Sequence, residues 1–278
     1  DSEQIKMELW KVVYGAWNHI KKSGLYPEAA NLTLEWVGVI PGKRESRRFE
    51  GLYTLTQHDI VQQTVFPDAI AYGGWAIDLH PAAGVYSALP SCNQYHSKGI
   101  YSIPYRCYVS KDIDNLFLAG RIISASHVAF GSTRVMVTSA LGGQAVGTAA
   151  ALCKAYNCNP AGLLEEERMR ALQQELSRDG QSIPHVPIRQ DNNLITKAAI
   201  KASSTMLLDG FVFNGEWQSL DFSRGMLLPL AGDTCYTFDL DVWGETETIL
   251  TADLMVSSKP YNYTPDVLLE RVECSVTT

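Results

Sequence analysis

The feature that most restricts the fold of this chain is a run of nineteen residues, 135–153, without a single charge. Its length would suffice for a helix that crosses a membrane. Three glycines, two threonines, a serine and a glutamine interrupt the run, which makes it too polar for a helix that faces lipid. The sequence therefore predicts a buried helix, extended to residues 134–156, and no membrane span.

The composition is that of a globular chain with a sizeable core. Hydrophobic residues make up 46% of the 278 residues and charged residues 19%, which is unlike a disordered chain. A net charge of −7 argues against nucleic acid as a partner, because such a surface needs clustered basic residues. Six cysteines without a CxxC pair argue against a zinc ribbon. A cytoplasmic protein and a processed secreted or periplasmic one would look alike, so the compartment stays open.

Hydrophobic periodicity predicts a mixed α/β (α+β) body over the first two thirds of the chain. Residues 4–21 have the spacing of an amphipathic helix. Thr56 and Asp59 match a capping box, which predicts a short helix that ends near residue 65. The predicted strands are 31–40, 51–56, 69–80, 99–109 and 115–119.

A helix and a linker precede a C-terminal region of different character. Asn159 and Pro160 predict the start of a helix that ends near Arg178, with Gly180 as its C-terminal cap. Residues 180–193 contain two prolines and read as a linker. Beyond it the apolar residues alternate in short runs, which predicts a small all-β module that resembles a sandwich.

The segment 115–152 combines a short apolar run, a glycine turn, a polar loop and the uncharged helix. Ser132, Thr133 and Arg134 are predicted to form the first turn of that helix. Free backbone N–H groups at a helix N-terminus and an arginine attract a negatively charged ligand. A buried helix that only packs tightly has the same composition, so the residues alone leave both interpretations open.

This segment resembles the flavin-contacting strand, loop and helix of FAD-dependent oxidoreductases of the two-domain, glutathione-reductase-like superfamily. Three further stretches resemble, more narrowly, a family of bacterial FAD-dependent oxidoreductases. They are LEWVGVIPGKRESRRFEG at 34–51, WAIDLH at 75–80 and IPYRCYVSKDIDNLFLAGR at 103–121. The resemblance implies an enzyme that transfers hydride between a small-molecule substrate of unknown identity and the flavin of FAD.

The chain departs from that superfamily in one respect. It contains no GxGxxG turn, the motif that holds the FAD pyrophosphate. The paired glycines at 73–74 and 142–143 have a different spacing. The resemblance therefore implies a C-terminal fragment without the N-terminal nucleotide-binding half. Such a fragment is expected to hold FAD weakly or not at all and to be inactive alone.

The resemblance also divides the chain into four predicted regions. These are a substrate-domain-like region at 1–112, the flavin-contacting strand, loop and helix at 113–158, a helix and linker at 159–193, and the β module at 194–278. An alternative interpretation is a non-catalytic binding or accessory protein that acts on glycans, because the aromatic residues of the β module could stack on sugars.

The resemblance places one group of residues against the cofactor. For the helix after Gly131, the resemblance implies contacts with the pyrimidine edge of the flavin, where reduced flavin carries negative charge. Gly120 and Arg121 would lie along the ribityl chain. The predicted cofactor-binding residues are Gly120, Arg121, Ser132, Thr133, Arg134 and Val135.

A second group is predicted to act on the substrate: Arg44, Arg47, Asp78, His80 and His127. Asp78 and His80 alternate on a predicted strand, so they share one face and could relay a proton. In the resembled family the charged run 41–48 lies beside the flavin, where its arginines would orient an anionic or hydroxylated substrate; a solvated charge cluster is the alternative. His127 could face the flavin ring. No metal site is predicted.

These residues lie far apart in the sequence. If the resemblance holds, we expect Arg44, His80, His127 and the turn after Ser132 to converge on one cleft, because hydride transfer needs a substrate held from several elements. Tyr105 and Arg106 could join the same wall.

Overall fold

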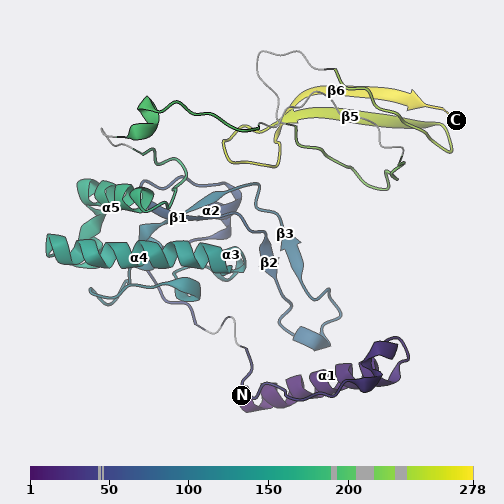
Figure 1. The fold of residues 1–278 in the computed structure, drawn as a ribbon, viewed down its shortest axis with the longest axis horizontal. Helices are drawn as coiled ribbons and strands as arrows, with labels where there is room; N and C mark the ends of the chain where they lie inside the picture. Colours follow the sequence, from purple (N-terminus) through teal and green to yellow (C-terminus); the bar gives the residue numbers. More distant parts are fainter. Residues whose placement is uncertain (43–44, 46, 189–192, 205–215, 229–236, 278) are drawn as a thin grey trace. The chain divides into compact units, whose positions relative to one another are not determined.

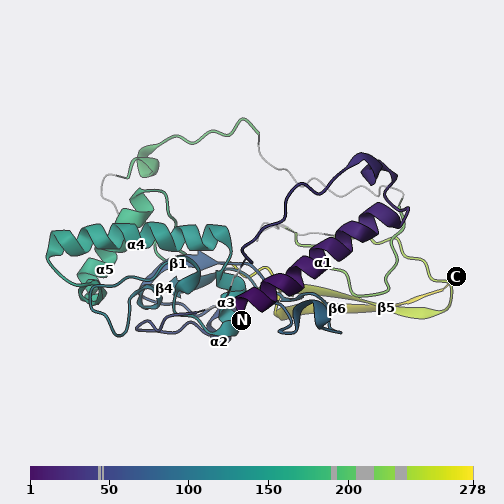
Figure 2. The same ribbon diagram turned by 90° about the horizontal axis from the view of Figure 1, so that it is seen from below.

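The computed structural model describes residues 1–42, 45, 47–188, 193–204, 216–228 and 237–277. The chain divides into two compact units, Asp1–Arg48 and Phe49–Thr278. Figures 1 and 2 together label the helices and strands, and the two units are described separately below.

The first unit is built on helix α1 (Ser2–Lys22), which confirms the helix predicted over 4–21. It begins at Asp1, whose carboxylate accepts a hydrogen bond from the backbone N–H of Glu3 at 3.1 Å. A 3₁₀ helix, η1 (Pro27–Asn31), follows. The strand predicted over 31–40 is wrong, because residues 32–40 pair with no other strand in the described chain.

The strands of the second unit form small antiparallel sheets of two strands each. β1 (Ala69–Gly73) pairs with β4 (Tyr101–Pro104), and β2 (Ile77–Leu79) pairs with β3 (Asn93–Tyr95). The third sheet pairs β5 (Thr248–Val256) with β6 (Val267–Val276).

Three strand predictions for the second unit need correction. The strands predicted over 51–56 and 115–119 are reduced to isolated bridges, such as Gly51 to Ser110 and Phe117 to Val109. The segment predicted as strands over 99–109 leaves the sheet after Pro104 and continues as the 3₁₀ helix η3 (Tyr105–Tyr108). Each correction concerns pairing between distant segments.

Helices of the second unit confirm part of the predicted helical structure. α2 (Gln57–Val61) carries the predicted capping box of Thr56 and Asp59. α4 (Met136–Tyr156) is the predicted uncharged helix, but it begins at Met136 rather than at residue 134. The polar loop predicted between the apolar run 115–119 and the uncharged helix is wrong in its second half, because a separate helix, α3 (His127–Thr133), occupies it.

The predicted helix after Asn159 consists of two pieces. These are the 3₁₀ helix η5 (Pro160–Leu164) and α5 (Glu166–Arg178). Gly180 follows with φ +88°, as expected of a C-terminal cap. Short 3₁₀ helices complete the described elements: η2 (Gly84–Tyr86), η4 (Gly120–Ile122) and η6 (Leu194–Lys197).

The small residues of α4 let it pack closely in the core. A Cβ on Gly142 would lie 2.4 Å from the ring of the fully buried Tyr108. α4 packs against β1 and α5, as Figures 1 and 2 show. By length and composition α4 could cross a membrane, but in this fold one of its faces is a core face.

The C-terminal part of the second unit contrasts with this core. Between residues 194 and 278 the described elements are η6 and the β5–β6 hairpin, with no α-helix among the described residues. A bridge from Gly99 to Asn262 connects the hairpin turn to the body. The described residues of this region form one hairpin, whereas a sandwich needs two packed sheets, so the predicted sandwich stays a prediction.

Candidate functional site

The candidate site is built where α3 packs against β2. Ser126 caps α3, and its Oγ accepts a hydrogen bond from the N–H of Ala129 at 3.2 Å. Gly131 faces the strand: a Cβ there would lie 2.9 Å from the carbonyl oxygen of Asp78. The absence of a side chain at Gly131 therefore lets α3 approach the β2 backbone and brings the end of α3 to Asp78.

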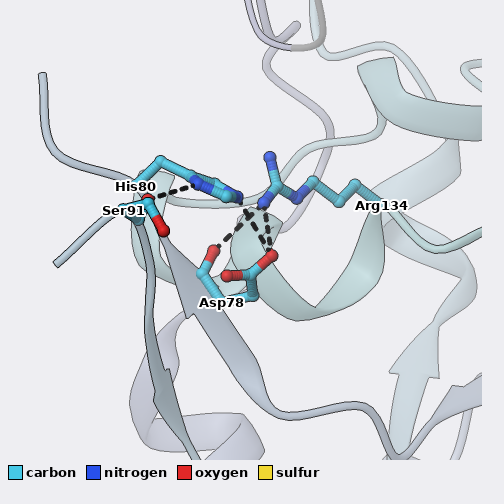
Figure 3. Close-up of polar contacts among 4 residues, drawn as sticks. All are labelled: Asp78, His80, Ser91 and Arg134. Atoms are coloured by element: carbon cyan, nitrogen blue, oxygen red, sulfur yellow. Dashed lines mark hydrogen bonds and ion pairs between the residues drawn. The ribbon is translucent and has the colours of Figure 1, made fainter. Parts of the chain in front are cut away.

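Arg134 follows α3 and is fixed by Asp78 (Figure 3). Its Nη2 donates to the Asp78 carboxylate at 3.0 Å and to the Asp78 carbonyl oxygen at 3.2 Å. The guanidinium also lies over the ring of Phe130, 5.7 Å from its centre, in the range of a cation–π contact. Nη1 and Nε of Arg134 have no hydrogen-bond partner among the described residues. They are therefore available to a ligand.

His80 joins the same cluster from the end of β2. Its Nε2 lies 3.2 Å from the Asp78 carboxylate, and its Nδ1 lies 2.9 Å from the carbonyl oxygen of Ser91. The side chain of His80 is 37% exposed. Asp78 and His80 are in contact, and their role as a proton relay stays a prediction.

Two predicted cofactor residues occupy a different turn from the one expected. Ser132 and Thr133 end α3 instead of opening α4. Ser132 is fully buried; its Oγ donates to the carbonyl oxygen of Trp75 at 2.6 Å and shares a 2.6 Å hydrogen bond with the hydroxyl of Tyr101. Its side chain is therefore used within the fold. Burial of Tyr101 raises the pKa of its phenol.

Thr133 and the start of α4 present unused donors. Thr133 is 2% exposed, and its Oγ1 has no hydrogen-bond partner among the described residues. Val135 is the N-terminal cap of α4 and provides no side-chain hydrogen bond. The first N–H groups of an α-helix have no partner within the helix, so the start of α4 carries free donors and a partial positive charge. Met136 and Val137 beside it are strongly exposed.

The remaining predicted residues are placed as follows. Gly120 has φ +66° and opens η4, which contacts α4, and Arg121 is exposed. His127 is exposed and begins α3 instead of lying in a loop. Arg44 lies outside the described residues, and Arg47 is an exposed residue of the first unit. The structure thus brings Asp78, His80 and Arg134 together, and the wider convergence stays a prediction.

Tyr105 and Arg106 do not join this wall. Arg106 forms a two-pronged ion pair with Asp68, at 2.9 and 3.1 Å, and Tyr105 is buried with its hydroxyl donating to the carbonyl oxygen of Pro160 at 2.8 Å. Arg106 also lies over the ring of Tyr53. Burial, together with a hydrogen bond to Asp59, raises the pKa of Tyr53 to about 12.

Two grooves of about 400 and 480 Å³ lie elsewhere in the second unit and share Val65 and His185. None of the predicted site residues lines them. We place the site at Asp78, His80 and Arg134 because charged groups with unused hydrogen-bonding capacity meet there. Among the described residues, no group of three or more His, Cys, Asp or Glu side chains could hold a metal ion.

Comparison with known proteins decides the family. The family model for FAD dependent oxidoreductases matches residues 1–176. The chain belongs to this family. The Asp78, His80 and Arg134 cluster and all of α4 lie inside the matched range, whereas the β5–β6 hairpin of this FAD dependent oxidoreductase lies outside it. Searches of curated proteins and of solved structures found no match.

Family membership establishes FAD as the cofactor, and the described residues can be tested against it. The pyrimidine edge of a flavin carries carbonyl oxygens and ring nitrogens that accept hydrogen bonds. Nη1 and Nε of Arg134, the Thr133 hydroxyl and the first N–H groups of α4 are donors without partners in the described chain. The exposed side chains of Met136 and Val137 offer apolar contact to a flat ring. These residues fit the flavin.

Proposed function

We propose that this chain provides the flavin-contacting part of an FAD-dependent oxidoreductase of the two-domain, glutathione-reductase-like kind, and that the whole enzyme transfers hydride between a small molecule and the flavin. The observation that carries the proposal is the Arg134 guanidinium, held by Asp78 beside the uncapped start of α4. Bound FAD would supply the N5 atom that accepts or donates the hydride.

The chain's own residues supply the electrostatics of such a site. Arg134 and the start of α4 both place positive charge where a reduced flavin would be negative. Asp78 holds Arg134 with a charge-assisted hydrogen bond, so the guanidinium needs little reorganisation when a ligand binds. Thr133 adds a hydroxyl donor.

The remaining predicted residues belong to the substrate side of the proposed site. We propose that Arg44, Arg47, Asp78, His80 and His127 hold the substrate and handle its proton, as the family resemblance implies. Gly120 and Arg121 would lie along the ribityl chain.

We further propose that the FAD pyrophosphate is held by residues outside this sequence, since the sequence contains no GxGxxG turn. A glycine turn at a helix N-terminus normally contributes much of the affinity for the dinucleotide. These 278 residues alone should therefore bind FAD weakly and turn over no substrate. Residues 194–278 would form the β module of the whole protein.

The test is FAD binding by the purified chain and by Arg134→Gln, followed through flavin fluorescence. Loss of one charge-assisted contact should weaken binding about tenfold. Arg178→Gln is the matched control, because Arg178 is an exposed arginine of α5 that pairs with Glu175. Equal FAD affinity in the Arg134 and Arg178 variants would remove Arg134 from the site. A circular dichroism spectrum of each variant checks that the fold is retained.

A further inference from the structure

The loop between β2 and β3 carries a side-chain contact across its neck, beside the last backbone pair of the two strands, Leu79 with Asn93. His80 directly follows β2, and Ser91 lies two residues before β3. The 2.9 Å contact between His80 Nδ1 and the Ser91 carbonyl oxygen therefore joins the two ends of the loop (Figure 3). The loop residues 81–90 contain no acidic or basic side chain, so no ion pair of their own holds them.

Both ring nitrogens of His80 face hydrogen-bond acceptors. The Ser91 carbonyl oxygen can only accept. The Asp78 carboxylate oxygen that faces Nε2 also accepts from Arg134 at 3.0 Å, so it acts as an acceptor towards both side chains. Both contacts of His80 can be hydrogen bonds at once only when the imidazole carries a proton on each nitrogen.

We infer that His80 is a proton-sensitive latch, a positioning residue whose doubly protonated ring fastens the loop 81–90 to Asp78. Loss of one proton leaves one N–H for two acceptors. A hydrogen bond to a carboxylate is stronger than one to a neutral carbonyl, so the remaining proton stays on Nε2 and faces Asp78. The contact with Ser91 is then lost, and the loop beyond the Leu79–Asn93 pair loosens.

The other groups around His80 set this balance. Arg134 approaches the same Asp78 carboxylate from the end of α3. β3, which pairs with β2, contributes Asn93, Gln94 and Tyr95 and no charge. α3, the helix packed on β2, carries one titratable side chain, His127, at its first residue. Because 37% of the His80 side chain is exposed, its proton can exchange with solvent.

The latch stands on contacts within the chain and does not depend on flavin binding. The latch would control the loop 81–90, which lies close to Asp78, the residue that holds Arg134. The loop exposes Val85, Tyr86 and Leu89. Loosening of the loop would let Val85 and Leu89 move while the contact between Asp78 and Arg134 stays in place.

Two measurements on the full chain test the latch. Side-chain ¹⁵N NMR of His80 follows its protonation and identifies the tautomer of the neutral ring. Hydrogen exchange follows the loop through the amides of Gly84, Tyr86 and Ser87, which are hydrogen-bonded within the loop's own turns. Their protection, corrected for the intrinsic pH dependence of exchange, should fall about fivefold as His80 loses its proton.

The variant pair is His80→Gln and His96→Gln; His96 is an exposed histidine just after β3. We expect the neutral ring of His80 to carry its proton on Nε2, and the protection of the loop amides to change at the same pH as the His80 ring. In His80→Gln this pH-dependent change should be absent. In His96→Gln it should be the same as in the unaltered chain. A neutral ring protonated on Nδ1 would overturn the latch. So would loop protection that ignores the titration of His80, or that keeps its pH dependence in His80→Gln. The NMR result on the unaltered chain decides the question even if a variant fails to fold.

Discussion

The body around α4 and the β5–β6 hairpin are both rich in apolar residues, yet only the body buries them. Tyr101, Tyr105 and Leu172 of the body are at most 1% exposed. Within the two strands of the hairpin, Val276 is the one residue that is buried. Leucines and valines of β5 and β6 such as Leu268 and Val272 remain about half exposed.

The two regions also differ in how polar groups are satisfied. In the body, buried amide side chains serve distant backbone carbonyls: Gln173 donates to Pro67 and Ala69, and Gln181 donates to Ile70. In the hairpin, an exposed ion pair between Arg271 and Asp253 joins the strands. A hairpin of two strands is at best marginally stable alone. We therefore expect most of the free energy of folding to come from the packing of the body.

The largest expected effect comes from a matched pair of leucines. Leu172→Ala in α5 removes a side chain that is fully buried, and should lower the free energy of unfolding by about 3 kcal/mol. Leu254→Ala in β5 removes one that is 41% exposed, and should cost about 0.5 kcal/mol or less. Urea titrations of both variants measure the difference. Equal losses would contradict the assignment of stability to the body.

A pair of neighbouring glycines in α4 sharpens the same comparison. Gly142→Ala places a Cβ against the buried ring of Tyr108 and should destabilise the chain by about 1–3 kcal/mol. Gly143→Ala meets no atom within 4 Å and should stabilise it by about 0.5–1 kcal/mol. Thermal unfolding should therefore shift in opposite directions. Shifts of the same sign would show that α4 does not pack on Tyr108 as described.

Alkaline pH should weaken the body, because it contains acidic groups with raised pKa values. Burial raises the pKa of Tyr53 from 10.0 to about 12 and that of Cys153 from 9.0 to about 11. A raised native pKa contributes stability that is complete below the unfolded value and is lost as the pH rises through the native value. Urea midpoints should thus fall between pH 9 and pH 12. In Tyr53→Phe the fall above pH 10 should be shallower, and an unchanged slope would count against this cause.

The smallest effect is expected in the hairpin. Arg271→Ala removes the ion pair with Asp253, which lies at the surface with side chains 52% and 31% exposed, and surface ion pairs contribute little to stability. The thermal midpoint of the chain should not change measurably. A clear fall in that midpoint would mean that the hairpin contributes to the stability of the body after all.

Local signals made part of the fold predictable from the sequence. The capping box at Thr56 and the proline after Asn159 each predicted the start of a helix, because a cap is satisfied by neighbours in the chain. α3 was missed because its sequence, HVAFGST, contains poor helix formers. The cap at Ser126 and the contact of Gly131 with β2 stabilise it instead.

Pairing between distant segments was the less predictable part. The run 31–40 has the apolar content of a strand, but a strand forms only where a partner lies alongside. At the site, the alternation of Asp78 and His80 predicted their shared face. The ion pair between Asp78 and Arg134 joins residues 56 positions apart, and no local pattern could reveal it.

The central claim is that the flavin of FAD meets the start of α4. The most direct test is a titration of the ¹⁵N-labelled chain with FAD, followed through the backbone amide signals. We predict that the largest shifts occur at Met136, Val137 and Thr138, with little change in β5 and β6. Shifts confined to the grooves around Val65 and His185, or no shift at α4 up to the solubility limit of FAD, would contradict the claim.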